Sequence, residues 1–417
     1  MASLVSTGLW ELSLLLLTTM QQDNVVPDLI SFNTSISACA GSGNWQAALS
    51  LLQWLQASLL RQDHFTYSSV LRACESHGHW QVSISLLAGM LEDLADPQPM
   101  CYRSVISACE QSSNWEMALC LLELHEGDVM GYSAAISATA KAAKWRAALF
   151  LLGVGMQAAK VEPNSVTYNS AISACERCSQ WQLALHLLAF LPAVSLQPTV
   201  VSFSSMTSAL EKSGEWPLAL QLLSEMPEKE VQPNVITYSS VIAACAGGSQ
   251  WELALCVFST ILEQSLDADE ISCNSAITAC EKAGQWIRAL NLLQGMSAMQ
   301  LEPSVVSWSS TISACENAEQ WQAAVALLHS MSCSRTEPNA LTLNSVISAC
   351  EKSSLWQKSL KLLFGMQEMG LEANGVTFNA AILACSRSRQ WQQALRLFSD
   401  MQSSGVDPEP LTFSAMA

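Results

Sequence analysis

Tryptophan recurs along this 417-residue chain at an almost constant interval, and this recurrence restricts the possible folds more than any other feature of the sequence. Twelve of the fourteen tryptophans lie in register from Trp10 onward, 35 residues apart except for one step of 30 residues and one of 36, and only Trp54 and Trp308 fall outside this register. Self-similarity at a fixed period is the signature of repeat architectures, in which one small unit is stacked many times. The tryptophans in register are Trp10, Trp45, Trp80, Trp115, Trp145, Trp181, Trp216, Trp251, Trp286, Trp321, Trp356 and Trp391.

Each unit has the pattern of two helices. In the unit Val235–Asp269, apolar residues follow helical spacing up to Cys245, Gly247 and Gly248 interrupt the pattern, and a second helical stretch begins at Trp251. A proline followed by a polar residue closes many units. A helix pair cannot bury its apolar faces alone. We therefore expect an all-α fold, a right-handed α-solenoid superhelix of helix-turn-helix repeats with a concave groove.

The period divides the chain into eleven repeats, followed by the start of a further repeat at 410–417. Residues 1–28 are expected to be a truncated repeat that keeps only the second helix. The short unit at 99–128 lacks five residues, so its second helix or closing loop should be short. Because the array begins and ends inside a repeat, we expect a fragment or a minimal array. The eleven repeats are 29–63, 64–98, 99–128, 129–164, 165–199, 200–234, 235–269, 270–304, 305–339, 340–374 and 375–409.

Tryptophan and cysteine each keep a fixed place in the unit. A large aromatic residue at a fixed helical position usually packs, so the tryptophans are predicted to be core anchors that start each second helix. Nine cysteines stand six residues before a tryptophan and are predicted to be small buried residues of the first helix. They are Cys39, Cys74, Cys109, Cys175, Cys245, Cys280, Cys315, Cys350 and Cys385.

Several classes of function are disfavoured by what the sequence lacks. It has no P-loop, GxGxxG, HExxH or nucleophile-elbow motif, and its six histidines form no ligand set, so we expect no enzyme and no cofactor. Cys175 and Cys178 form a lone CxxC pair without a second pair nearby, so we expect no metal. No apolar run reaches the roughly 18 residues that would span a membrane. The formal net charge of −17 opposes nonspecific attraction to a polyanion.

The stretch VTYNSAISACERCSQWQLALHLLAFLPAVSLQPT (Val166 to Thr199) resembles a pentatricopeptide repeat. The likeness rests on V-T-Y-N at the start of the first helix, A-L inside the second, and proline with a polar residue at the end. It extends over residues 29–409, and the regular tryptophan is a departure from the usual pattern of the family. The resemblance implies an α-solenoid that binds single-stranded RNA with one base per repeat, reading each base with a few side chains.

In that family, apolar residues at the second position of successive repeats sandwich a base. All second positions here are apolar, including Phe65, Met100, Met130 and Leu411. The alternative is that these residues are ordinary core. The residues to which the resemblance assigns base stacking are Ile30, Val166, Val201, Ile236, Ile271, Val306, Leu341 and Val376.

The resemblance assigns base recognition to the fifth position of a repeat together with its last position. The fifth position is Asn or Ser in every repeat except the short unit, which has Arg103. Helix capping is the alternative explanation for the last position, because Asp, Asn and Ser are good N-caps. The base-binding residues are Asn33 with Asp63, Ser68, Ser133 with Asn164, Asn169 with Thr199, Ser204 with Asn234, Ser239 with Asp269, Asn274 with Ser304, Ser309 with Asn339, Asn344 with Asn374, and Asn379.

These pairs predict an RNA sequence. An Asp acceptor suits the ring N–H of uracil or guanine, and an Asn or Ser donor suits the ring nitrogen of adenine or cytosine. The family associates Asn at the fifth position with pyrimidines and a small hydroxyl with purines. The predicted site, from 5′ to 3′, is U-x-x-A-Y-A-G-C-A-Y-Y, and we expect no base specificity at the short unit.

Basic residues are scarce, but six of them stand four residues before a tryptophan, where the resemblance places a contact with the RNA backbone. A cation near the end of a helix is also stabilised by the helix dipole without any ligand. The glutamates that precede several of these cations partly cancel their field. The predicted phosphate-binding residues are Lys141, Arg177, Lys212, Lys282, Lys352 and Arg387.

The sequence therefore predicts a monomeric protein that binds single-stranded RNA in organelle RNA processing, stability or translation, and that can recruit protein partners to the transcript. A chloroplast or mitochondrial location is implied by the resemblance, although no transit peptide is visible. The alternative is a protein–protein interaction scaffold with the same solenoid fold. The acidic charge favours this alternative, and the regular fifth and last positions disfavour it.

Overall fold

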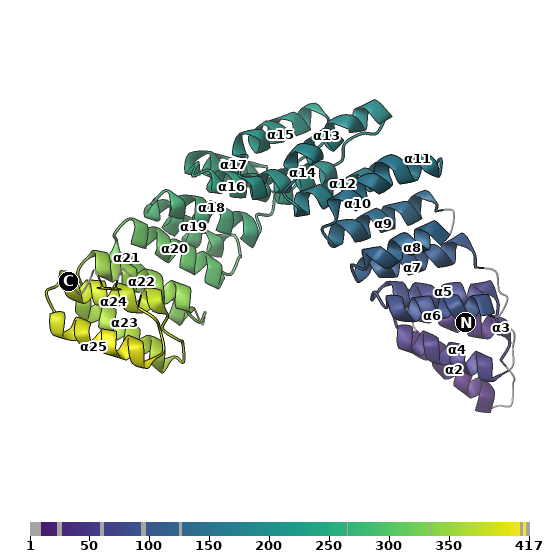
Figure 1. Cartoon of the computed structure of the whole chain (residues 1–417), viewed down its shortest axis with the longest axis horizontal. Coiled ribbons are helices and arrows are strands. Elements are labelled where there is room, and N and C mark those ends of the chain that lie inside the picture. The colour runs from purple at the N-terminus through teal and green to yellow at the C-terminus, as the bar shows by residue number, and fades with distance from the viewer. Residues whose placement is uncertain are drawn as a thin grey trace. The chain divides into compact units, whose positions relative to one another are not determined.

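The computed structural model describes residues 10–22, 27–58, 62–92, 97–124, 127–264, 266–334, 336–408 and 412–413. Every regular element in these ranges is helical, which confirms the predicted all-α class (Figure 1). The chain divides into two compact units, Met1–Ala209 and Leu210–Ala417.

In the first unit, α2 (Trp10–Gln22) is followed by pairs made of a first helix and a second helix that begins at a tryptophan. The fourth second helix is irregular and contains a π-helical turn, η1. The fifth ends in a 3₁₀ turn, η2. The pairs are α3 (Leu29–Ser42) with α4 (Trp45–Ala57), α5 (His64–Glu75) with α6 (Trp80–Glu92), α7 (Pro99–Gln111) with α8 (Trp115–Leu124), α9 (Val129–Lys141) with α10 (Trp145–Phe150), η1 (Leu151–Gly155) and α11 (Met156–Ala158), and α12 (Ser165–Arg177) with α13 (Trp181–Phe190) and η2 (Leu191–Val194).

The division between the units falls inside α14 (Val200–Ser213). The second unit continues with α15 (Trp216–Glu228) and then has the same regular pairs. These are α16 (Val235–Gly247) with α17 (Trp251–Glu263), α18 (Glu270–Lys282) with α19 (Trp286–Ala298), α20 (Val305–Asn317) with α21 (Trp321–Cys333), α22 (Ala340–Lys352) with α23 (Trp356–Glu368), and α24 (Gly375–Arg387) with α25 (Trp391–Ser403).

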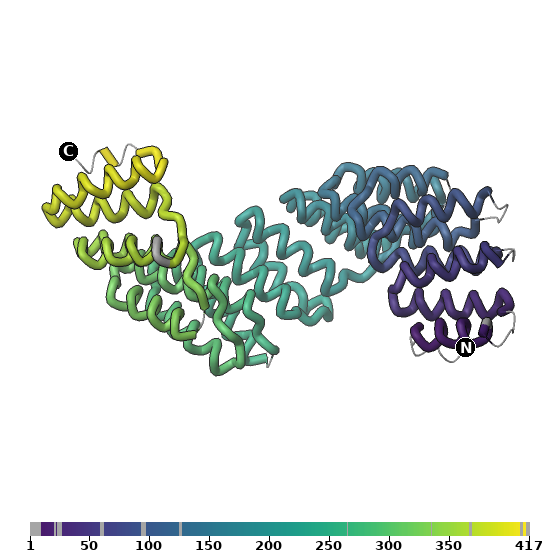
Figure 2. Tube along the Cα trace, turned by 90° about the horizontal axis from the view of Figure 1, so that it is seen from below, coloured from purple at the N-terminus to yellow at the C-terminus, as the bar shows by residue number. Residues whose placement is uncertain are grey.

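Within each unit the helices form two layers. Neighbouring first helices contact each other directly, as α16, α18 and α20 do, while each second helix packs on the first helix of its own repeat and on that of the next. The tube view shows this stacking of successive helix pairs within each unit (Figure 2). The first helices are therefore the more closely spaced layer, and this is the solenoid arrangement that the period predicts.

The same turn ends the first helix in each repeat that has a described turn. The residue two places before the tryptophan has a left-handed backbone, for example Ser249 with φ 56° and Gly284 with φ 65°. The next residue donates its N–H to the carbonyl of the residue five places earlier, as from Gln250 to Cys245 at 2.9 Å. This is the hydrogen-bond pattern of a Schellman motif, which satisfies carbonyls at a helix end. The turn fixes the angle at which the second helix leaves.

The core lies between the two layers, and its largest side chains come from the fourth position of the repeat. Among the most deeply buried large residues are Phe32, Tyr67, Phe203 and Phe378. In the last repeat, Phe378 packs with Leu363, Ile382, Leu397 and Met401. The nine cysteines predicted to be buried are buried. Burial raises the pKa of the Cys245, Cys280 and Cys315 thiols to about 11.

Each tryptophan begins its second helix as predicted, but the indoles are less buried than the prediction of core anchors implies, and Trp356 packs against the core of the last repeat. From Trp10 to Trp356 they are half-buried, and Trp391 is 64% exposed. Several indoles lie against the start of the next second helix. The Lys358 ammonium lies 3.7 Å from the centroid of the Trp321 ring, and the His79 and Trp45 rings are 4.2 Å apart. Within the described residues no further second helix follows α25 to contact Trp391.

Gly248 shows how tightly an indole fits against the following turn. A Cβ atom added to Gly248 would lie 2.2 Å from Cδ1 of Trp216, whereas one added to Gly247 would meet nothing within 4 Å. Gly248→Ala should therefore lower the free energy of unfolding by about 1–3 kcal/mol, the usual range for an overpacked site. The matched control Gly247→Ala should leave it within about 1 kcal/mol of the wild type. Thermal or urea unfolding of the two variants measures this difference, and equal stabilities would contradict the described contact.

Candidate nucleic-acid interface

The second-position residues are exposed, although they are apolar. The eight residues predicted to stack on bases are between 54% and 70% exposed, with Val166 and Val306 at the low end and Ile30 at the high end. Phe65, Met100 and Met130 are also exposed, and Leu411 lies outside the described residues. The alternative that these residues are ordinary core is therefore wrong. Exposed apolar side chains at one repeated position form a row that leaves apolar surface in water, and such surface commonly marks a binding site.

The fifth-position residues lie beside this row and are less exposed. Asn33, Asn169, Asn274 and Asn344 are half-buried, and Asn379 is buried. Ser133, Ser239 and Ser309 are buried at 6–8% exposure. Each fifth-position serine donates its hydroxyl to the carbonyl three residues earlier in its own helix, as Ser239 does to Ile236 at 2.9 Å. The asparagines instead contact the next repeat.

The last-position residues cap the first helix that follows them. Asp63, Asp128, Asn164, Asn234, Asp269, Asn339 and Asn374 each accept a hydrogen bond from the backbone N–H at the third residue of that helix. Gln98 makes no such side-chain bond. The capping explanation is thus correct, and it has a chemical consequence. One side-chain oxygen is committed to the helix, so the outer atom is a carboxylate oxygen in Asp and an amide nitrogen in Asn.

The two predicted recognition positions of a repeat meet in several places. The Asn33 amide nitrogen lies 3.3 Å from Oδ1 of Asp63, and that of Asn169 lies 3.1 Å from the Thr199 hydroxyl. The Asn344 amide nitrogen lies 3.4 Å from Oδ1 of Asn374. Burial acts to raise the pKa of the Asp63 carboxyl, but hydrogen bonds from Thr66 and Asn33 outweigh it, so the pKa is lowered and the group stays an acceptor.

A hollow of about 230 Å³ follows the first-helix layer of the first unit. It is lined by residues of α5, α7, α9 and α12, among them Met130 and Val166 from the second position and Ser133 from the fifth. Arg103 and Glu110 also line it. The structure thus brings stacking, recognition and charged positions of successive repeats into one depression.

Three of the six predicted phosphate-binding cations form ion pairs with the preceding repeat. Lys141 lies 3.1 Å from Glu110, Lys352 lies 3.5 Å from Glu316, and Arg387 lies 3.2 Å from Glu351. The partner is in each case the residue five places before the previous tryptophan. That position is alanine before Arg177 and before Lys282, namely Ala140 and Ala246.

The two cations that follow an alanine behave differently. Arg177 donates to the carbonyl of Lys141 at 3.4 Å. Lys282 is exposed and has no hydrogen-bond or ion-pair partner within the described part of the chain. Lys282 is therefore the cation best placed to accept an external anion without first giving up a glutamate.

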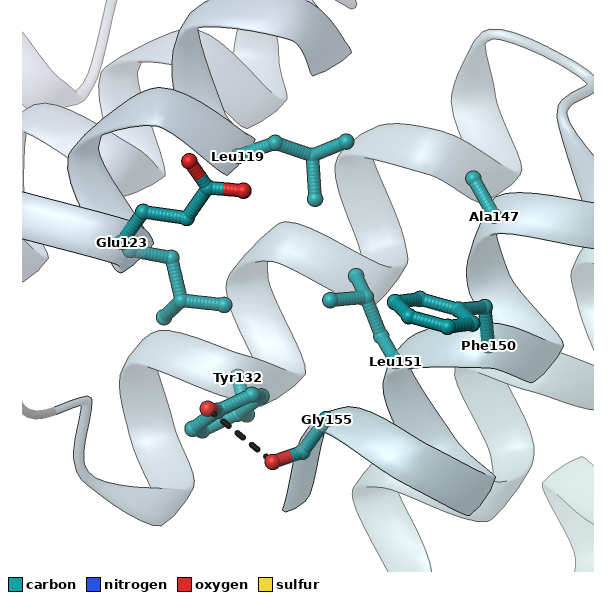
Figure 3. A pocket seen from close by; sticks show the side chains of 8 residues that line it. Leu119, Glu123, Tyr132, Ala147, Phe150, Leu151 and Gly155 are labelled. Atoms are coloured by element: carbon teal, nitrogen blue, oxygen red, sulfur yellow. Dashed lines mark hydrogen bonds between the residues drawn. The ribbon is translucent and has the colours of Figure 1, made fainter. Parts of the chain in front are cut away.

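The short unit departs from its neighbours at its second helix. Helix α8 has 10 residues, where α17 and α19 have 13. Beside it lies a cavity of about 190 Å³ between α8, α9 and the irregular second helix that follows (Figure 3). The Tyr132 hydroxyl donates to the carbonyl of Gly155 at 3.3 Å, inside the π-helical turn. Arg103, in place of Asn or Ser, lies 3.7 Å from Asp128.

Sequence profiles of the pentatricopeptide repeat match along most of the chain. The PPR repeat family matches residues 198–247, 303–352 and 373–417, and the pentatricopeptide repeat domain matches residues 126–177. The PPR repeat matches residues 65–93, 166–190, 271–301 and 341–371. The chain belongs to the pentatricopeptide repeat family. No curated protein sequence matches it.

One solved structure shows the same fold, and two others align less closely. The crystal structure of the pentatricopeptide repeat protein PPR10 from maize aligns with a TM-score of 0.61 at 18% identity, over 98% of this chain and 68% of that protein. PPR10 in complex with an 18-nucleotide psaJ RNA element aligns at a TM-score of 0.43 and 17% identity, over 100% and 80%. Yeast Rmd9p in complex with a 16-nucleotide target RNA aligns at 0.37 and 9% identity, over 94% and 88%.

Two other classes of site have no support in the described residues. No group of three or more His, Cys, Asp and Glu side chains there could hold a metal ion. Cys175 is buried, and the Cys178 thiol donates to the carbonyl of Ala143 at 3.1 Å. No described helix is long and apolar enough to cross a lipid bilayer.

One of the glutamates that pair with the predicted phosphate-binding cations, Glu351, is buried, with 8% of its surface exposed. Burial raises the pKa of its carboxyl, and Arg387 and Lys352 offset this only in part. A raised pKa in the folded state means that the protonated form is favoured by folding. This contribution is complete below the ordinary pKa of glutamate and is lost as the pH rises through the folded-state pKa.

Glu351→Gln should therefore raise the unfolding temperature at pH 7, because the neutral amide avoids burying a charge. We expect a few degrees, since about 1 kcal/mol shifts Tm by roughly 2–4 °C in a unit of this size. The gain should shrink toward zero as the pH is lowered below the ordinary range of glutamate. The control Glu372→Gln, at an exposed side chain, should leave Tm unchanged. A lower Tm for Glu351→Gln at pH 7 would show that the ion pair outweighs burial.

Proposed function

We propose that this protein binds single-stranded RNA along its first-helix layer, with one base for each of the repeats 29–63 to 375–409. The observation that carries the proposal is the row of exposed second-position side chains, which lies beside regularly placed polar groups. Bases have flat apolar faces and polar edges. An apolar row beside donors and acceptors at a fixed interval matches that chemistry.

The caps supply the recognition chemistry. Oδ1 of Asp269 accepts the Ser272 N–H at 2.8 Å, so Oδ2 is the remaining acceptor. Oδ1 of Asn339 accepts both the Thr342 N–H and the Thr342 hydroxyl, so the amide nitrogen is the remaining group and is a donor. Asp at the last position therefore suits guanine or uracil, and Asn suits adenine or cytosine. The geometry of the cap supports the predicted order U-x-x-A-Y-A-G-C-A-Y-Y.

The biological setting follows from the family. We propose an organelle transcript as the target, in the chloroplast or mitochondrion, and an effect through occlusion or recruitment of partners to the RNA. We propose binding without catalysis by this chain. A protein-binding scaffold is the second candidate, and the observation that favours it is the net charge of −17. Filter binding with random RNA and capture of proteins from a lysate separate the two.

The sharpest test of base recognition is a single change of acceptor to donor. Asp269→Asn keeps a good N-cap, because the asparagine oxygen can still accept the Ser272 N–H, and replaces the outer oxygen with an NH₂ group. At the base assigned to Ser239 and Asp269, the ratio of affinities for G over A should fall by roughly tenfold, since one base contact contributes about 1–3 kcal/mol.

The reciprocal control is Asn339→Asp, which should move preference from A toward G at the base assigned to Ser309. RNAs that differ only at the tested base are compared at one salt concentration. If both variants bind RNA with wild-type preferences, the caps do not read bases, and the assignment fails whatever the total affinity.

The ion pairs between neighbouring repeats predict unequal roles for two lysines of the second unit. Lys282→Ala should weaken binding to every RNA sequence and reduce the slope of log affinity against log salt by about one unit. Lys352→Ala should have a smaller effect, because Lys352 is engaged with Glu316. Affinity over a range of salt concentrations measures both effects. Equal slopes for the two variants would show that the glutamate does not compete with phosphate.

A further inference from the structure

Every fifth-position asparagine shares one contact, and its partner is outside the positions that the sequence assigns to base recognition. Its side-chain oxygen accepts a hydrogen bond from a hydroxyl 33 residues later, at the third position of the next first helix. The distances are 2.6 or 2.7 Å in all cases, and the hydroxyl residue is buried each time. The pairs are Asn33 with Thr66, Asn169 with Ser202, Asn274 with Ser307, Asn344 with Thr377, and Asn379 with Thr412.

Repeats with serine at the fifth position lack this contact. The third-position hydroxyl that follows them bonds to its own cap residue. Thr167 donates to the carbonyl of Asn164 at 2.6 Å, Ser272 to that of Asp269 at 2.8 Å, and Thr342 to Oδ1 of Asn339 at 2.7 Å. The hydroxyl lies near its own cap residue in asparagine repeats too, as Thr66 does at 2.7 Å from Asp63 and Thr377 at 2.9 Å from Asn374. Among the described residues, the additional contact with the preceding repeat occurs where the fifth position is asparagine.

The contacts on both sides of the carboxamide fix its orientation. A hydroxyl could either donate to the amide oxygen or accept from the amide nitrogen, so the contact alone does not orient the carboxamide. The Thr377 oxygen accepts the backbone N–H of Asn374 at 3.2 Å, and the Ser202 oxygen accepts that of Thr199 at 3.0 Å. The asparagine nitrogen lies against the last-position side chain, 3.3 Å from Oδ1 of Asp63, 3.1 Å from the Thr199 hydroxyl and 3.4 Å from Oδ1 of Asn374. The carboxamide therefore presents its oxygen to the hydroxyl and its NH₂ group to the last position, with a second N–H left over.

We propose that the third-position hydroxyl is a positioning residue that determines base class in the preceding repeat. It acts by holding the fifth-position asparagine with its amide nitrogen toward the bound base. A pyrimidine of either kind has a carbonyl at C2, which accepts a hydrogen bond, whereas adenine has C2–H and guanine has an amino donor there. The second N–H of the asparagine therefore favours both pyrimidines. The inference rests on the proposed RNA binding and adds a residue to the recognition set.

Two threonines of the second unit provide a matched pair for the test. Thr377 follows Asn344 and holds it, whereas Thr342 follows Ser309, whose hydroxyl donates to the carbonyl of Val306 instead. Both threonines are fully buried at the third position of a first helix. Valine keeps the shape of threonine without the proton, and Thr377→Ser keeps the proton without the methyl group.

The first measurement needs no RNA. In a double-mutant cycle, Thr377→Val and Asn344→Ala should shift the unfolding temperature non-additively, because each removes the same hydrogen bond. Thr342→Val and Ser309→Ala should be additive, because these side chains do not bond to each other. Additivity in both cycles would overturn the proposal.

The second measurement compares RNAs that carry U, C, A or G at the base assigned to Asn344 and Asn374. Thr377→Val should lower the preference for pyrimidine over purine about three- to tenfold, the range for one hydrogen bond. Thr377→Ser should restore it. Thr342→Val should leave the preference at the base assigned to Ser309 within about twofold of wild type, because the Thr342 N–H still holds Asn339.

The two measurements separate the inference from the proposed function. If the wild type prefers a pyrimidine and Thr377→Val keeps that preference in full, the hydroxyl does not position the asparagine, and the inference is overturned while RNA binding stands. If the wild type shows no preference at this base, base reading fails, and the double-mutant cycle still decides whether the hydroxyl holds the asparagine.

Discussion

The first backbone N–H groups of a helix have no acceptor within the helix and need one from outside it. The way the first helices meet this need determines how the fifth- and last-position side chains are arranged. The last residue of each repeat supplies the oxygen. This uses one atom of its side chain and leaves the other to face outward, so the choice between Asp and Asn becomes a choice between an acceptor and a donor. The hydroxyl at the third position completes several of these caps, as at Asn374 and Thr377. Capping and the proposed base recognition would therefore be two uses of one arrangement.

The fold could be predicted almost completely from the period. Tryptophan spacing, helical apolar patterns and prolines located the helix pairs, and the missing residues in the short unit predicted the shortened α8. The row of cysteines was correctly placed in the core because a small residue at a fixed helical position has few other roles. These features are local, since each is decided within one helix or one turn.

Contacts between repeats were harder to predict. The tryptophans recur as regularly in sequence as core residues do. Their side chains, however, also contact the turn of the following repeat, as the approach of Trp216 to Gly248 shows. Likewise, Thr377 and Thr342 look identical in sequence, and only the residue 33 positions earlier separates their partners. The ion pairs also depend on the preceding repeat. Lys352 and Lys282 occupy the same repeat position, but Lys352 follows a repeat with a glutamate partner and Lys282 follows one with alanine at that place.

The exposed second-position row has a consequence for the protein when it is not bound to a ligand. Side chains such as Ile271 and Leu341, each 65% exposed, keep apolar surface in contact with water at a regular interval. Covering that surface is favourable, whether the cover is a ligand or another copy of the chain. The net charge of −17 makes copies of the chain repel each other, which opposes covering this surface with another copy. The same negative charge that weakens attraction to a polyanion therefore also disfavours association between copies through the exposed second-position row.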